Sequence, residues 1–367
     1  MILTKKETLY YYYSNPKKIY KIAAFDLDYT LIKTASGNVF PKDENDWTWL
    51  YDNVPKKLKQ LVADEYSIAI FTNQKGISQG KQTIQNFSIK VENIIKELDI
   101  PIDILIATDD DWFRKPMTGM WEFYLETHKI QNIDESFYCG DAAGRTYVNK
   151  KLNDHSDADI NFANNINLKF KMPEEIFEQQ LNKQYVIKSK YDNLKLIDLI
   201  SEKQKSMELK EKEMVILIGP PASGKSTFTK LYYPSYIHIN RDTEKTDAKC
   251  LKKTEDALKK NKSIIIDNTN PSIKSREKYI DLANQYGYSI KIYSFEIDKP
   301  TIEHLNYYRT QISKGKIKLI PEIAYRMFAS KYEEPTDLEF NNNNYEIIKY
   351  KPKIFEDILY NEFYFRF

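Results

Sequence analysis

The sequence predicts an α/β protein of two domains, each with a sheet of short buried strands and helices between them. The first reason is that short apolar runs alternate with stretches of helical period along the whole 367-residue chain, which is typical of α/β domains. The second is the run 219–227, which reads GPPASGKST and directly follows the apolar segment 214–218. The third is a separate group of acids and hydroxyls that follow apolar runs in the first half. A chain of this length is long enough for two domains of ordinary size.

Four strands are predicted in each half. Those of the first half lie at 22–25, 67–71, 102–107 and 137–140, and those of the second at 215–218, 236–239, 263–266 and 290–295. Apolar side chains between the second and third runs fall on one face of a helix, namely Ile84, Phe87, Val91, Ile94, Ile95 and Leu98. The tyrosine cluster 10–13 fits a packed edge segment, and stacking on nucleic-acid bases is the alternative.

The segment 188–213 separates the two halves. It is charged, mixed in sign and free of Gly and Pro, so we predict a surface helix that links a domain at 1–187 to a domain at 214–367. The polar tract 341–344 is expected to be a loop.

Composition excludes several classes of protein. The net charge of +2 argues against a broadly basic nucleic-acid coat, although a local basic groove is compatible with it. Cys139 and Cys250 form no disulfide framework, and the four histidines are too dispersed for a zinc site. No apolar run reaches membrane-spanning length, and the N-terminus lacks a signal-peptide core. We therefore expect an intracellular protein of the nucleus or cytoplasm, not secreted and not bound to a membrane.

Two carboxylates, Asp26 and Asp28, directly follow the first predicted strand. Residues i and i+2 of an extended chain point the same way, so the two acids aim at one spot and repel each other unless a cation lies between them. Oxygen ligands suit Mg²⁺. An aspartate can also act as a nucleophile that forms an aspartyl-phosphate, while its neighbour donates and retrieves the proton. Taken alone, the pattern also fits a solvated loop.

Three further pieces follow later strands of the first half. Thr72 offers a hydroxyl for phosphoryl oxygens, Lys115 offers a balancing positive charge, and Asp141 offers a third acid for Mg²⁺. In this order the set is similar to that of a haloacid-dehalogenase-type phosphatase, which strengthens the catalytic interpretation of the two aspartates.

The run 219–227 is a complete phosphate-binding loop after a buried strand. Its glycines let backbone N–H groups turn inward around a phosphate chain, Lys225 can reach the β- and γ-phosphates, and Ser226 can ligate Mg²⁺. We therefore expect ATP here, bound by Gly219, Ser223, Gly224, Lys225, Ser226 and Thr227.

Longer stretches are more specific than either site: FDLDYTLIKTASGNVFP, IFTNQKGI, RKPMTGMWE, GDAAGR, INRDT and IIDNTNPS. With them, the chain resembles the bifunctional polynucleotide 3′-phosphatase/5′-kinases of animal-type domain order over residues 21–335. The resemblance implies a haloacid-dehalogenase-like Rossmannoid phosphatase followed by a P-loop kinase. Such an enzyme removes 3′-terminal phosphates and phosphorylates 5′-hydroxyl ends with ATP, which prepares breaks for ligation in DNA repair.

The resemblance also implies individual roles. In the phosphatase half these are the nucleophile Asp26, the acid/base Asp28, the phosphoryl-binding Thr72 and Lys115, the Mg²⁺ ligands Asp26, Asp28 and Asp141, and the supporting residues Arg145 and Asp159. In the kinase half they are the general base Asp242, the Mg²⁺ ligand Ser226, the supporting acid Asp267, and Arg276 and Arg309 as cations near the transferring phosphate.

Some alternatives stay open. Asp242 also fits a helix cap, Arg309 a surface salt bridge, and Trp121 and Cys139 simple core packing.

Tyr29 stands where the family carries Gly and is expected to narrow or floor the pocket. The animal enzymes carry a forkhead-associated domain, which the few residues before the phosphatase cannot hold, so we expect no recruitment by that route. We expect a monomer that acts on DNA rather than RNA. The rival functions are a metabolite phosphatase fused to a small-molecule kinase, and an inactive end-binding adaptor.

Overall fold

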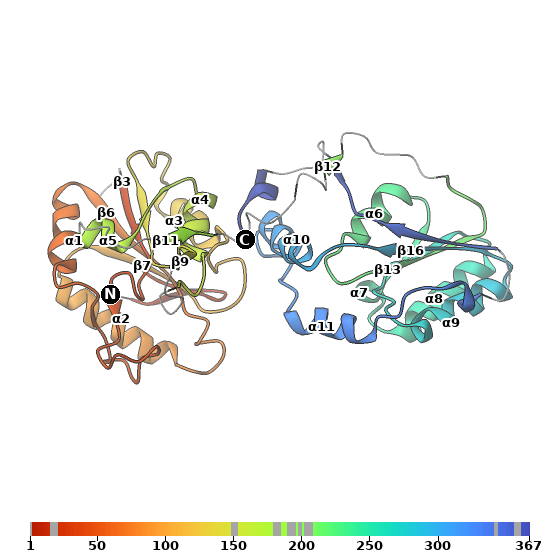
Figure 1. Ribbon diagram of the computed structural model, residues 1–367, viewed down its shortest axis with the longest axis horizontal. Coiled ribbons are helices and arrows are strands. Elements are labelled where there is room, and N and C mark those ends of the chain that lie inside the picture. Colours follow the sequence, from red (N-terminus) through yellow and green to blue (C-terminus); the bar gives the residue numbers. More distant parts are fainter. Residues whose placement is uncertain are drawn as a thin grey trace. The chain divides into compact units, whose positions relative to one another are not determined.

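The computed structural model describes residues 2–14, 21–147, 153–178, 185–188, 196, 200–201, 208–340, 344–355 and 361–367. The chain divides into two compact units. The first unit comprises Met1–Asn193, Tyr307–Leu319 and Asn361–Phe367, and the second comprises Leu194–Asn306 and Ile320–Tyr360. Each contains a mainly parallel sheet with helices, which confirms the predicted α/β class (Figure 1). None of the helices in the described ranges is both long and apolar enough to cross a lipid bilayer.

The first unit is built on a seven-stranded sheet of order β1-β2-β7-β6-β3-β8-β10. Its strands are β1 (Thr4–Lys6), β2 (Leu9–Tyr12), β3 (Lys21–Phe25), β6 (Tyr66–Asn73), β7 (Ile102–Ala107), β8 (Phe137–Cys139) and β10 (Lys169–Lys171). The strands from β3 onward pair in parallel, and β2 pairs antiparallel with β7. The predicted strands of the first half are thus confirmed, and the tyrosine cluster lies in a packed strand.

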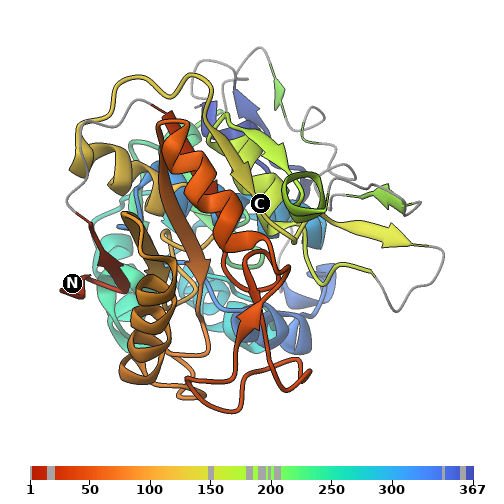
Figure 2. The same ribbon diagram turned by 90° about the vertical axis from the view of Figure 1, so that its left-hand side faces the viewer.

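Helices cover both faces of this sheet. Apolar side chains of α1 (Val54–Ala63) and α2 (Ile84–Leu98) pack on one face, while those of α3 (Gly119–His128) and α4 (Ala158–Asn165) pack on the other. Figure 2 shows the ribbons of α1 and α2 on the side of the sheet that faces the viewer. The helix predicted from periodicity is α2, which begins where the Thr83 side chain accepts a hydrogen bond from the Asn86 N–H. Its Phe87, Val91 and Ile94 are buried as predicted.

The smaller elements of the first unit lie around this core. They are the strand pair β4 (Ile32–Lys33) and β5 (Thr48–Trp49), the strand pair β9 (Arg145–Tyr147) and β11 (Tyr185–Ile187), the short helix α5 (Pro173–Phe177) and a 3₁₀ turn at Asn361–Tyr364. The segment Tyr307–Leu319 also packs in this unit. Gln311 Nε2 donates to Thr118 Oγ1 at 2.6 Å, and Lys314 Nζ lies 3.1 Å from Glu122 Oε2.

The second unit is built on a five-stranded sheet of order β14-β15-β13-β16-β17, all parallel. Its strands are β13 (Glu213–Ile218), β14 (Ile237–Ile239), β15 (Ile264–Ile266), β16 (Ser289–Phe295) and β17 (Tyr345–Tyr350). Every residue of β13 is buried, as expected for a central strand covered on both faces. The predicted strands of the second half are confirmed, while β17 was not predicted.

Helices flank this sheet as well. The helical elements are α6 (Lys225–Tyr232), α7 (Arg241–Glu244), α8 (Asp247–Lys259), α9 (Ile273–Gln285), α11 (Glu322–Lys331) and a 3₁₀ turn at Asp337–Glu339. The helix α10 (Lys299–Ile312) begins in this unit, and its residues from Tyr307 onward belong to the first unit. Side chains of α8 and α9 share one core cluster with the sheet, and those of α6 share another with its opposite face. The phosphate-binding loop therefore connects a buried strand to a packed helix.

The predicted surface helix at 188–213 needs correction where it can be judged. Most of that segment lies outside the described residues. Ile200–Ser201 form the strand β12, which pairs in parallel with β18 (Ile354–Phe355). The helix is therefore wrong for these two residues, whose backbone pairs with β18, and for residues 208–213, which form irregular chain, a turn and the first residue of β13. Three residues of the expected loop at 341–344 also lie outside the described part.

Candidate active sites

The first site lies at the carboxyl edge of the sheet in the first unit. Asp26 directly follows β3, Thr72 lies near the end of β6, and Asp141 is the second residue after β8. Because these strands are parallel, their carboxyl ends meet at the same edge, where ligands of open α/β sheets bind. The structure thus brings together residues that are far apart in the sequence.

Three carboxylates form a cluster there. Asp26, Asp141 and Asp159 each offer an oxygen atom within 4.8 Å of the others. Burial raises the pKa of Asp26 to about 7 although Lys115 opposes the shift, and burial with the neighbouring acids raises the pKa of Asp141. Buried like charges of this kind can all be ionised only when positive charge compensates them. The cluster therefore has the character of a cation site.

Lys115 supplies part of that charge. Its Nζ lies 2.6 Å from Asp26 Oδ1 and 2.7 Å from Asp159 Oδ1, and it donates to the Tyr138 hydroxyl at 2.8 Å. Burial alone would lower the pKa of Lys115, but Asp159 and Asp26 raise it, so the ammonium form is favoured. Three carboxylates against one ammonium leave two negative charges, which is the charge that one divalent cation balances.

Asp28 stands apart from that cluster in the described residues. Its Oδ2 accepts a hydrogen bond from Gln74 Nε2 at 2.6 Å, and the same amide nitrogen donates to Thr72 Oγ1 at 2.8 Å. Gln82 in turn donates to Gln74 Oε1 at 2.8 Å, which fixes the orientation of the amide. Sequence reasoning missed Gln74, and the signal that could have found it is its place two residues after Thr72 in the same loop.

Arg145 and Tyr29 border the site. Arg145 donates from Nη2 to the Asp141 carbonyl at 2.9 Å and pairs with Asp154 and Glu174, so it fixes the backbone that carries Asp141. Tyr29 has a φ of 57°, in the left-handed region that favours glycine, which accounts physically for glycine at this position in the resembling family. Its hydroxyl donates to the Val39 carbonyl at 3.2 Å.

The second site begins at the phosphate-binding loop in the second unit. A Cβ atom at Gly219 would lie 2.9 Å from both Phe295 Cβ and Ser223 Oγ, so only glycine fits there. Gly224 has a φ of 88° and stands directly before α6. Lys225 lies folded over the loop, where its Nζ donates to the carbonyls of Gly219 and Pro220 at 2.9 and 2.7 Å.

An acid from the neighbouring strand reaches this loop. Asp267 follows β15, and its Oδ2 accepts from Ser226 Oγ at 2.6 Å. The same oxygen lies 2.8 Å from His238 Nε2. The structure thus brings the predicted Asp267 to the predicted Ser226. It also adds His238, which sequence reasoning missed even though it stands in the same stretch as Asp242.

Asp242 lies exposed in α7, after β14. The residue that caps α7 is Asn240, whose side chain accepts from the Thr243 N–H, and the cap of α8 is Thr246. The alternative interpretation of Asp242 as a helix cap is therefore wrong. An exposed carboxylate at the end of a strand remains suited to meet a substrate hydroxyl.

Arg276 was predicted to be a cation near the transferring phosphate, but its guanidinium is not exposed to bind a phosphate. It is fully buried, and its Nε and Nη2 each donate to Glu339 at 2.7 Å. Its Nη1 donates to the carbonyls of Asn270 and Pro271. With these hydrogen bonds the guanidinium links α9 to the segment before β17, so the predicted catalytic role is wrong. Arg309 donates to the Lys318 carbonyl at 2.9 Å, and its kinase role remains a prediction.

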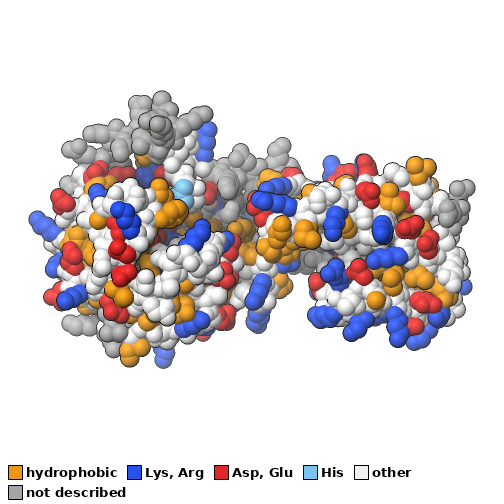
Figure 3. All heavy atoms as spheres, turned by 90° about the horizontal axis from the view of Figure 1, so that it is seen from below, with side chains coloured by type: hydrophobic (Ala, Val, Ile, Leu, Met, Phe, Trp, Pro, Cys, Tyr) orange, Lys and Arg blue, Asp and Glu red, His pale blue; other side chains and the backbone are white. Residues whose placement is uncertain are grey.

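The remaining sequence assignments concern packing and surface charge. Trp121 and Cys139 are buried in the core, as the packing alternative predicts. Two lysines of α8 pair with acids, Lys253 with Glu244 at 2.5 Å and Lys259 with Glu255 at 2.7 Å. Basic side chains on the face shown in Figure 3 are accordingly interspersed with acidic ones.

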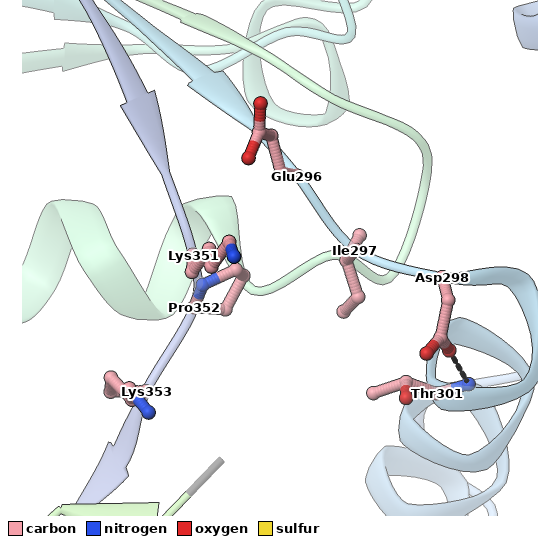
Figure 4. Close-up of a pocket in the computed structure, with 7 residues that line it drawn as sticks. All are labelled: Glu296, Ile297, Asp298, Thr301, Lys351, Pro352 and Lys353. Carbon is pink, nitrogen blue, oxygen red and sulfur yellow. Dashed lines mark hydrogen bonds between the residues drawn. The ribbon is translucent and has the colours of Figure 1, made fainter. Parts of the chain in front are cut away.

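A pocket of about 230 Å³ opens where β16 and β17 end. Its lining residues come from the two segments after these strands: Glu296, Ile297, Asp298, Thr301, Lys351, Pro352 and Lys353 (Figure 4). Asp298 Oδ1 accepts from the Thr301 N–H at 2.7 Å and so shapes one wall.

Known proteins resemble both halves of the chain. Residues 21–177 match the family described as polynucleotide kinase 3 phosphatase, and residues 214–335 match the AAA domain family. The polynucleotide 3′-phosphatase of Saccharomyces cerevisiae is 32% identical over 42% of this chain and 87% of its own length.

Two relatives cover both halves. The bifunctional polynucleotide phosphatase/kinase of Schizosaccharomyces pombe is 40% identical over 92% of this chain and 82% of its own length. The putative bifunctional polynucleotide phosphatase/kinase of Acanthamoeba polyphaga mimivirus is 35% identical over 86% of this chain and 81% of its own length. With a phosphatase-type acidic site in one unit and a phosphate-binding loop in the other, the chain belongs to the family of bifunctional polynucleotide phosphatase/kinases.

Proposed function

We propose that the protein heals nucleic-acid breaks: it removes 3′-terminal phosphates in the first unit and phosphorylates 5′-hydroxyl ends with ATP in the second. The observation that carries this proposal is the contact between Asp26 and Lys115 inside a buried acidic cluster, in a chain that also holds a complete phosphate-binding loop. Ends treated in both ways can be joined by a ligase, which gives the two activities a common purpose in DNA repair.

In the phosphatase reaction, Asp26 attacks the phosphorus of the 3′-phosphate and forms an aspartyl-phosphate. Asp28 protonates the leaving 3′-oxygen and then takes a proton from the water that hydrolyses the intermediate. Gln74 supports this role because its amide holds the Asp28 carboxylate beside the Thr72 hydroxyl. Lys115 and Thr72 bind the phosphoryl oxygens, where positive charge and hydrogen-bond donors stabilise the transition state.

The acidic cluster fits a divalent metal ion. Oxygen ligands and a net charge of minus two suit Mg²⁺, so Asp26, Asp141 and Asp159 would hold it. When bound, the ion supplies positive charge to the phosphoryl oxygens. Asp28 was also predicted from the sequence to be a metal ligand. Its carboxylate instead accepts a hydrogen bond from Gln74 and lies apart from the acidic cluster, which favours the acid/base role.

In the kinase reaction, the loop 219–227 binds the phosphates of ATP through backbone N–H groups and Lys225. Asp242 accepts the proton of the 5′-hydroxyl as the γ-phosphate is transferred in line. Ser226 would hold Mg²⁺ on ATP, with Asp267 orienting its hydroxyl. Arg309 is retained as a candidate cation for the transferring phosphate.

The nucleoside end of ATP is assigned to the pocket between the ends of β16 and β17. The neighbour of β16 in the sheet is β13, whose end carries the phosphate-binding loop, and parallel strands place their ends at one edge. Phe295, the last residue of β16, already approaches Gly219. Lys351 and Lys353 line this pocket.

The substrate is proposed to be DNA rather than RNA, and the enzyme to act as an intracellular monomer in the nucleus or cytoplasm. The test uses an oligonucleotide with a 3′-phosphate and a 5′-hydroxyl, in DNA and RNA form, beside a panel of small phosphate esters and hydroxyl compounds. Release of phosphate and ³²P transfer are both expected on the DNA ends at rates at least about tenfold above those on the small compounds. Equal or faster turnover of a small compound contradicts the proposal and favours the metabolite alternative.

A further inference from the structure

His238 occupies an unassigned position between two parts of the kinase site. It is the middle residue of β14, which pairs in parallel with β15, so its side chain lies next to the residue that follows β15. That residue is Asp267, whose side chain is only 2% exposed, while the His238 side chain is 28% exposed. A carboxylate buried to this degree requires hydrogen-bond donors.

Two donors converge on the same carboxylate oxygen. Ser226 Oγ donates to Asp267 Oδ2 at 2.6 Å, and His238 Nε2 lies 2.8 Å from that atom. Ser226 is the second residue of α6, directly after Lys225. The imidazole therefore reaches the phosphate-binding loop through a single carboxylate.

Two contacts of His238 Nε2 favour opposite tautomers, because the amide nitrogen of Asn240 is a donor and favours an unprotonated Nε2, whereas the Asp267 carboxylate is an acceptor and favours a protonated one. Asn240 Nδ2 lies 3.2 Å from His238 Nε2, and its orientation is fixed because Asn240 Oδ1 accepts from the Thr243 N–H at 2.8 Å. One imidazole nitrogen of a neutral ring either donates or accepts. The contact with Asp267 is shorter and has a charged acceptor, which makes it the stronger of the two. Nε2 therefore carries the proton and donates to Asp267.

We propose that His238 is a positioning residue of the kinase: its Nε2–H holds Asp267 in the orientation that fixes the Ser226 hydroxyl at the phosphate-binding loop. His238 acts through Asp267 and not by contact with either substrate. The inference rests on the proposed function, since it assumes that Ser226 serves the ATP-bound metal. Loss of the imidazole donor then impairs the use of Mg²⁺ and the turnover of bound ATP, while the binding of the 5′-hydroxyl strand is preserved.

The test compares His238→Gln with His238→Asn. The Gln side chain carries its amide nitrogen as many bonds from the backbone as His carries Nε2, so it can still donate to Asp267. The Asn side chain is one methylene shorter and cannot reach. We expect H238N to lower the kinase kcat at saturating ATP by at least about tenfold and to raise the Mg²⁺ concentration for half-maximal rate, with the KM for the oligonucleotide within threefold. H238Q is expected within threefold of wild type in all three quantities.

The phosphatase rate and the melting temperature of each variant, measured on the same sample, control for folding. The proposal is overturned if H238N and H238Q behave alike, or if H238N leaves the kcat and the Mg²⁺ requirement within twofold of wild type. A second measurement needs no variant: ¹⁵N NMR of the histidine rings in the wild-type chain should show His238 protonated on Nε2, and a ring protonated on Nδ1 alone contradicts the inference.

The outcome can be separated from a failure of the proposed base. If Asp242→Asn leaves the kinase rate unchanged, the assignment of Asp242 is wrong, whereas the comparison of H238N with H238Q and the tautomer of His238 still decide the role of His238.

Discussion

The charges around a buried cation decide whether its role in this protein is structural or catalytic. Arg276 is an example of the structural role and Lys115 of the catalytic one. Both are buried cations that contact carboxylates. The charge of Arg276 is neutralised by the Glu339 carboxylate, and two carbonyls accept hydrogen bonds from its Nη1, so the group is not available for chemistry. Lys115 faces more negative charge than it can balance, so its site still attracts a cation. Burial alone would not have distinguished a structural from a catalytic cation.

Removing the acid that neutralises Arg276 should destabilise the second unit. Glu339→Gln leaves a buried guanidinium without its counter-charge, which typically costs about 3–5 kcal/mol. The matched control is Glu322→Gln, which removes a partner from the exposed Arg326 and is expected to change the free energy of unfolding far less. Urea unfolding of both variants measures the difference. Equal effects of the two substitutions would show that the buried pair is not what holds α9 in place.

The acidic cluster should respond to Mg²⁺ in the absence of substrate. Ligand binding to the folded state raises its stability, so we expect Mg²⁺ at millimolar concentration to raise the melting temperature of the first unit. Asp141→Asn removes one ligand and should reduce this rise by more than half. Asp110→Asn is the control, because Asp110 is a partly exposed acid that pairs with Lys75 outside the cluster. A rise in Asp141→Asn as large as in wild type argues against this cluster as the metal site.

In both units, the functional residues lie at the carboxyl ends of strands, and the phosphate-binding loop is the clearest case. Its path is fixed by backbone fit: a buried strand delivers Gly219 beside Phe295, and Gly224 turns the chain into α6. Such a loop binds phosphate through N–H groups, so its shape matters as much as its side chains.

Gly219→Ala should therefore distort the loop. The added Cβ would lie 2.9 Å from Phe295 Cβ, closer than packed carbon atoms tolerate, and something must shift. We expect the KM for ATP to rise at least about tenfold, which corresponds to about 1.4 kcal/mol of lost binding, with the phosphatase rate unchanged. Kinase kinetics with varied ATP measure this. An unchanged KM would mean that the loop relaxes without loss of phosphate contacts.

The turn α7 should serve the hydroxyl substrate rather than ATP. Since Asp242 follows a different strand from the phosphate-binding loop, Asp242→Asn should keep the ATP affinity within a few-fold. Loss of a general base typically costs ~10²–10⁴ in rate. Single-turnover phosphorylation at saturating ATP should therefore slow by at least about a hundredfold. A rate within a few-fold of wild type would transfer the base role to another acid, and Asp267 would be tested first.

The sequence could predict those parts of each site that are close together in the chain. Asp26 with Asp28, and the loop 219–227, carry their chemistry within a few residues after an apolar run. Gln74 and His238 escaped prediction because their roles depend on partners brought together by strand pairing. The pair Arg276–Glu339 could not be foreseen for the same reason. The short strand β12 was missed because two residues carry no periodicity that could identify a strand.

At the scale of the whole molecule, each unit contains the acids and the lysine of one proposed chemistry, while the candidate kinase cation Arg309 belongs to the segment Tyr307–Leu319 of the first unit. The phosphatase residues Asp26, Lys115 and Asp141 belong to the first unit. The kinase residues Lys225, Asp242 and Asp267 belong to the second. Since each site takes its catalytic acids from the strand ends of its own sheet, one activity can be removed without loss of the other. This separability is the central claim for a chain that treats both ends of a break.

The most direct test measures both activities of Asp26→Ala on one oligonucleotide with a 3′-phosphate and a 5′-hydroxyl. Phosphate release should be abolished, because the nucleophile is gone, while ³²P transfer to the 5′-end should stay close to the wild-type rate. A melting curve excludes unfolding as the cause. A kinase rate lowered by more than about tenfold, equal to roughly 1.4 kcal/mol, in a folded Asp26→Ala protein would contradict two independent sites.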